Sequence, residues 1–137
     1  MNSNTKAKTI GCYLMFLLMT LSAAFKIFHF GPSVHFYVYP LQEAFLTAVP
    51  YIELIGGILY LIGAKKPIYR VYGGIVTIPV LIGAMASHIA FGWFNLWGGI
   101  TESPFLILPS SIIFCLAVWV SYEPIKDFIN SKSYKAT

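Results

Sequence analysis

Four long apolar stretches limit what this chain can fold into. They span Ile10–Phe30, Phe45–Ala64, Val71–Trp93 and Pro104–Tyr122, with lengths of 21, 20, 23 and 19 residues. A helix crosses the hydrocarbon core of a bilayer with about 20 mostly apolar residues. The spacing therefore predicts an all-α, polytopic membrane protein: one domain, residues 1–137, forming a bundle of four transmembrane helices.

The composition agrees with this prediction. Hydrophobic residues make up 58% of the 137 residues and charged residues only 10%, whereas soluble domains have about 45–50% and about 25%. A small chain exposes much of its surface, so it cannot keep this many apolar groups away from water. The composition argues against a soluble enzyme, a disordered protein and a nucleic-acid binder. The lipid bilayer is the expected environment.

The first apolar stretch has two readings. Lys6 and Lys8 precede an apolar run, and Ser22-Ala23-Ala24 resembles the small-residue cleavage site of a signal peptide. The apolar run, however, continues to Phe30 and is interrupted only by Lys26. We therefore expect an uncleaved first helix rather than a signal peptide.

The basic residues predict the orientation. Eight of the nine fall on one side of the four-span topology: Lys6, Lys8, Lys65, Lys66, Arg70, Lys126, Lys132 and Lys135. Cytoplasmic segments of membrane proteins carry an excess of lysine and arginine. We expect both termini and the second loop to be cytoplasmic, residues 123–137 to form a cytoplasmic tail, and the chain to be a multi-pass protein of the bacterial inner (plasma) membrane.

Three ionisable residues fall inside the predicted spans: Lys26, Glu53 and His88. At 1.5 Å per residue, their backbones lie about 6, 12 and 7.5 Å below the outer boundary. A lone charge at the centre of a membrane helix costs about 3 kcal/mol or more. An acid and a base at similar depth can reduce that cost by pairing, so we predict a direct contact between Lys26 and Glu53.

The role of this polar set has several interpretations. It can be a structural ion pair that fixes helix register, or a ligand-binding or proton-relay pocket formed by Lys26, Glu53 and His88. Metal binding is disfavoured because Lys26 places a competing cation beside the ligands, and no metal site is predicted. His29 and Glu102 are possible additional site residues. Glu102, which is followed by Pro104, also suits the start of the fourth helix.

These residues resemble a known pattern. The sequence resembles the DoxX-like family of small four-helix membrane proteins over roughly residues 10–122. The resemblance rests on Lys26 in the first span, on Glu53-Leu54-Ile55-Gly56-Gly57 in the second, and on Ala84 and His88 in the third. The chain departs from the pattern at Ala23 and Ala24, where the family usually has a glycine before its lysine. It also lacks the Gly-Pro-Gly-like ending of many members, having Ser121-Tyr122-Glu123-Pro124 instead.

The resemblance implies a compact four-helix bundle and, in some relatives, a role as a small subunit of a quinone-linked oxidoreductase complex. We therefore expect an accessory or anchor subunit of a membrane redox complex, with a redox partner subunit and a quinone held together with that partner. A homo-oligomer is also possible. The alternative is a non-catalytic membrane interaction or assembly protein whose polar set is structural. Small-molecule transport is less favoured, because a glutamate that pairs with lysine is a poor cation site.

Overall fold

The computed structural model describes residues 3–28, 42–87, 89 and 107–133 of the chain. Four helices account for most of this part: α1 (Ser3–Ile27), α2 (Gln42–Gly63), α3 (Ile68–Ser87) and α4 (Ile107–Ser133). No strand occurs among the described residues. The predicted all-α fold with four helices is therefore confirmed.

Three of these helices are long and apolar enough to cross a membrane, over Thr5–Ile27, Ile68–Ala86 and Leu108–Ser131. In α2 the corresponding apolar segment is shorter, Thr47–Gly63. Many large apolar side chains lie on the outside of the bundle, among them Leu17, Ile75 and Ile112. An apolar exterior of this kind is compatible with contact to lipid, and the chain has the character of a membrane protein.

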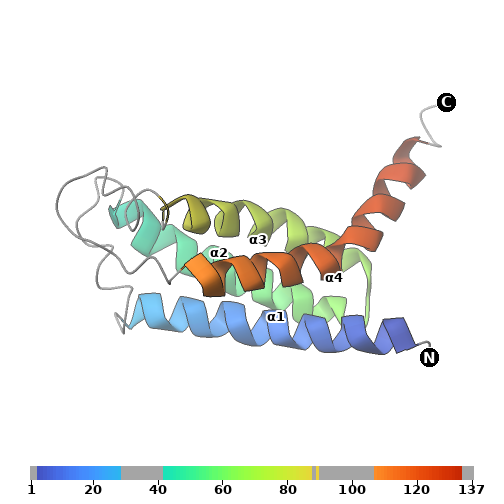
Figure 1. The fold of residues 1–137 in the computed structure, drawn as a ribbon, viewed down its shortest axis with the longest axis horizontal. Coiled ribbons are helices and arrows are strands. Elements are labelled where there is room, and N and C mark those ends of the chain that lie inside the picture. Colours follow the sequence, from blue (N-terminus) through green and yellow to red (C-terminus); the bar gives the residue numbers. More distant parts are fainter. Residues whose placement is uncertain (1–2, 29–41, 88, 90–106, 134–137) are drawn as a thin grey trace.

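The helices pack in sequence order around one core. α1 packs against α2, α2 against α3 and α3 against α4, whereas α1 and α4 make a smaller contact. The start of α1, the turn between α2 and α3, and the end of α4 all lie at one end of the bundle (Figure 1), which we call the terminal end. The other end of the bundle, where α1 ends and α4 begins, is called the opposite end.

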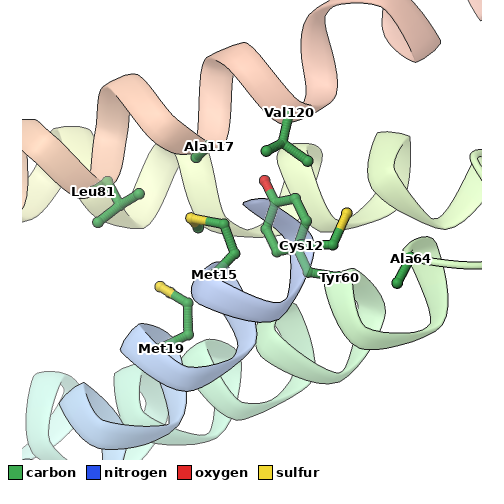
Figure 2. Close-up of a cluster of buried hydrophobic side chains, with 8 residues drawn as sticks. All are labelled: Cys12, Met15, Met19, Tyr60, Ala64, Leu81, Ala117 and Val120. Carbon is green, nitrogen blue, oxygen red and sulfur yellow. The ribbon is translucent and has the colours of Figure 1, made fainter. Parts of the chain in front are cut away.

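The core draws side chains from all four helices (Figure 2). Its buried members are Cys12, Met15, Met19, Tyr60, Ala64, Leu81, Ala117 and Val120. Glycines bring the helices close together around this core. A Cβ atom added to Gly56 would lie 2.2 Å from Cγ2 of Thr77, and one added to Gly74 would lie 2.8 Å from Oγ of Ser121. The small residues therefore set the α2–α3 and α3–α4 spacing, as small residues do between membrane helices.

Two helices extend well beyond the predicted boundaries. α1 begins at Ser3, not at Ile10, and α4 continues to Ser133 although its apolar stretch ends at Tyr122. Hydropathy alone cannot set these ends, because polar residues also form helix once an apolar segment has nucleated it. Pro124 lies inside α4, and the C-terminal part of the helix turns away from the bundle axis (Figure 1).

Candidate functional site

A buried ion pair joins α1 to α2 near the opposite end of the bundle. The Lys26 ammonium donates hydrogen bonds to both Glu53 carboxylate oxygens, with Nζ–Oε1 2.6 Å and Nζ–Oε2 2.8 Å. Ser22, one helical turn before Lys26, joins them: Lys26 Nζ donates to Ser22 Oγ at 2.7 Å, and Ser22 Oγ donates to Glu53 Oε1 at 3.1 Å. The predicted contact between Lys26 and Glu53 is confirmed, and Ser22 completes what we call the clamp.

The hydrogen bonds of the clamp are well matched. A lysine ammonium has three donor hydrogens and no acceptor, and Lys26 Nζ has three acceptor atoms within 2.8 Å. The Glu53 side chain is only 5% exposed and that of Lys26 is 20% exposed. Hydrogen bonds from every donor offset the cost of burying a charge pair in an apolar interior.

The α2 helix presents Glu53 to the bundle together with a stripe of small and polar residues. Glu53, Gly56, Gly57 and Tyr60 are all buried, as their spacing of three and four residues predicts for one helix face. A Cβ atom added to Gly57 would touch Met19 and the Phe16 carbonyl of α1. The glycine positions thus hold α2 close to α1, which allows Lys26 to reach the Glu53 carboxylate.

The other predicted site residues lie outside the part of the chain that the structure describes. His29, His88 and Glu102 are in this group, so the proposed participation of His88 in the pocket stays a prediction. Within the described ranges, no group of three or more histidine, cysteine, aspartate or glutamate residues could hold a metal ion.

A neutral hydrogen-bonded cluster lies closer to the terminal end, where α2, α3 and α4 meet. The Tyr60 hydroxyl lies 3.2 Å from Thr77 Oγ1 and 3.0 Å from Ser121 Oγ. Thr77 Oγ1 also donates to the Gly73 carbonyl at 2.8 Å. The participation of Ser121 was not predicted from the sequence. A serine directly after the apolar run Ile112–Val120 was the available signal.

Two basic residues that were used to predict the orientation are buried at the terminal end. Lys8 of α1 pairs with Glu123 of α4, and Arg70 of α3 donates from Nε to the Gly63 carbonyl at 2.7 Å. Lys8 and Arg70 are each only 6% exposed. Arg70 satisfies a carbonyl at the C-terminus of α2, where the helix has no further N–H of its own to offer.

Comparison with protein-family models, with curated proteins and with solved structures gives no match. The resemblance to the DoxX-like family therefore stays a prediction from the residues. The structure provides two local sets of polar contacts, the clamp and the Tyr60 cluster. In the clamp, acid, base and hydroxyl hydrogen-bond to one another, and the Tyr60 cluster is neutral and buried.

Proposed function

We propose that this protein is a small DoxX-like accessory subunit of a membrane complex, and that its clamp serves to hold α1 against α2. The saturation of the Lys26 ammonium by Glu53 and Ser22 carries this proposal. A lysine whose three donors are already engaged has none left for a substrate. A bundle of this kind acts by binding a partner protein in the membrane through its outer surface.

The partner class comes from the resemblance to the DoxX-like family. A quinone-linked redox complex is the first candidate, because some small four-helix members of that family are subunits of such complexes. The chain has no flavin, haem or iron–sulfur motif of its own. Electron transfer would therefore belong to the partner, and this chain would anchor or assemble it.

Affinity purification tests this role. The tagged full-length chain is extracted from its native membrane in a mild detergent, and co-purifying proteins are identified by mass spectrometry. We expect a flavoprotein or another redox subunit at constant ratio to the tagged chain. A tagged multi-pass protein of similar size is the control. Recovery of the chain alone, or of the same proteins as the control, would overturn the accessory role in a redox complex.

We propose four membrane spans with both termini in the cytoplasm. The support is the placement of eight of the nine basic residues on one side. A reporter that is active only in the cytoplasm should be active when fused after Thr137 and silent when inserted after Gly98. The reverse pattern would contradict the orientation, and two active fusions would contradict the number of spans.

A ligand-binding or proton-relay pocket is the second candidate function. One observation favours it: the Lys26 side chain is 20% exposed, so the clamp is not sealed. His88 would supply the titratable group, because imidazole exchanges protons near neutral pH, and a quinone carbonyl is a suitable acceptor. The substitution His88→Gln should then abolish activity of the assembled complex while the bundle stays folded. Full activity of a folded His88→Gln variant would remove His88 from the site.

A further inference from the structure

The α4 helix is longer than a membrane crossing requires. Its 27 residues, Ile107–Ser133, correspond to about 40 Å at 1.5 Å per residue, whereas the hydrocarbon core of a bilayer is about 30 Å thick. The apolar stretch ends at Tyr122, and Pro124 follows within the helix. Proline removes one hydrogen bond of the helix ladder and bends the helix, and Figure 1 shows the last part of α4 leaving the bundle axis.

The segment beyond the bend has an apolar face that is turned toward the bundle. Ile125, Phe128 and Ile129 follow the three- and four-residue spacing of one helix face. Cδ1 of Ile125 lies 3.3 Å from the position that a Cβ on Gly74 of α3 would take. The face that carries Ile125 is therefore directed to the bundle side, which is also the side of the bilayer.

At Ile129 the apolar face is no longer covered by the other helices of the bundle. It lies one turn after Ile125 on the same face, and it is 60% exposed. Asp127 and Asn130, on the other side of the helix, and Lys126, at the edge of the apolar face, are exposed as well. The segment is thus amphipathic, with its polar side away from the bundle.

The residues around the bend match the chemistry of a lipid surface. Trp119 and Tyr122, just before the bend, are 44% and 60% exposed, and exposed aromatic residues of this kind gather at the boundary between membrane and water. Lysines outnumber acids in residues 125–137, with Lys126, Lys132 and Lys135 against the single Asp127. Lysines at a membrane surface can bring their ammonium groups to the phosphates of the lipid.

We propose that residues 123–133 form an interfacial helix that lies on the membrane surface, with anionic phospholipid as its partner. The Ile125 and Ile129 side chains enter the boundary between head groups and acyl chains. The lysines contact the head groups. The predicted cytoplasmic tail is then a membrane-bound element over most of its length. The proposal requires only that α4 cross the bilayer, and it holds whether or not the protein belongs to a redox complex.

Nitroxide spin labels on the full-length chain test this placement. The native cysteines are replaced by Cys12→Ala and Cys115→Ser, and one label is attached through Ile129→Cys or, as the matched control, Asn130→Cys. The chain is reconstituted in nanodiscs of phosphatidylethanolamine and phosphatidylglycerol. Collisions with oxygen, which concentrates in lipid, and with a water-soluble nickel chelate are then compared. We expect the oxygen-to-nickel ratio to be severalfold higher at residue 129 than at residue 130.

Two other results would overturn the proposal. Strong nickel collisions at both positions would place the segment in water, and shielding from both reagents at residue 129 would indicate contact with protein, such as a second copy of the chain. A label at Ile112→Cys verifies insertion, because it should collide more with oxygen in every case. Ile112 is 67% exposed and lies in the middle of the apolar stretch of α4. Discs of phosphatidylcholine alone should lower the ratio at residue 129 if anionic lipid is the partner.

Discussion

The ion pairs Lys26–Glu53 and Lys8–Glu123 both join α1 to another helix, but they differ in how much of the acid is enclosed. The Glu53 side chain is 5% exposed and that of Glu123 is 56% exposed. Glu53 receives hydrogen bonds from an ammonium and a hydroxyl. Lys8 donates to a carboxylate oxygen of Glu123 at the terminal end of the bundle.

This difference shows how position in the bundle determines what a charge requires. Between α1 and α2 the two charges must compensate each other, because an unpaired buried charge is strongly destabilising. At the terminal end the Lys8 side chain is also buried, with 7% exposed, but solvent reaches the Glu123 carboxylate and can hydrate it. We therefore expect this pair, which has one exposed partner, to contribute less to stability than the enclosed pair.

The largest effect is expected from breaking the buried pair. Glu53→Gln or Lys26→Met leaves one charge without its partner, and such changes typically cost about 3–5 kcal/mol. Each variant should show a large loss of thermal stability in detergent, followed by circular dichroism or by dye binding to exposed thiols. A variant with wild-type stability would mean that the remaining charge is not confined to the bundle interior.

The next effect is expected at the close contact between α2 and α3. In Gly56→Ala the new Cβ would lie 2.2 Å from Cγ2 of Thr77, so α2 and α3 must separate, and overpacking of this kind costs about 1–3 kcal/mol. Gly83→Ala is the matched control, because nothing lies within 4 Å of the corresponding position. The melting temperature should fall for Gly56→Ala and stay the same or rise for Gly83→Ala. Equal effects of the two substitutions would argue against the close contact.

A smaller effect is expected at Ser22. The substitution Ser22→Ala removes one hydrogen bond to Glu53 and one acceptor for Lys26, while the ion pair itself remains. We expect a loss of about 1 kcal/mol in the free energy of unfolding, the usual size for a single hydrogen bond. A loss as large as that of Glu53→Gln would show that the hydroxyl, and not the ion pair, dominates the clamp.

The smallest effect is expected at the terminal end. In Glu123→Gln the side-chain oxygen can still accept a hydrogen bond from Lys8, whose side chain is 7% exposed, and solvent reaches position 123. We therefore expect the free energy of unfolding to change by less than about 1 kcal/mol. The stabilisation by the Lys8–Glu123 pair should decrease as salt is added, since salt screens exposed charges more than buried ones. The effect of Glu53→Gln should depend little on salt. A large, salt-independent loss in Glu123→Gln would remove the distinction between the two pairs.

Much of the helical fold could be predicted from the sequence because each apolar stretch is a local signal. Lys26 and Glu53 could be paired in advance for a similar reason: their depths follow from distance along a helix, and an isolated charge in either place is costly. The shared burial of Glu53, Gly56, Gly57 and Tyr60 agrees with their helical spacing.

What escaped prediction depends on contacts between distant residues. Nothing local to Ser121 indicates that it meets Tyr60, because that contact depends on the rotation of α4 about its own axis. The pairing of Lys8 was not predicted, since its partner Glu123 lies at the other end of the chain. The continuation of α4 through Pro124 depends on packing of Ile125 against α3, which outweighs the local preference of proline to end a helix.

A double-mutant cycle on Lys26 and Glu53 tests most directly whether the clamp holds the bundle together. The thermal stabilities of the wild type, Lys26→Met, Glu53→Gln and the double variant are measured in the same detergent, and the coupling is the difference between the double loss and the sum of the single losses. Because the double variant strands no charge, it should recover part of the loss, so that it is destabilised by clearly less than that sum. Strictly additive losses would contradict the clamp and, with it, the structural role proposed for the buried pair.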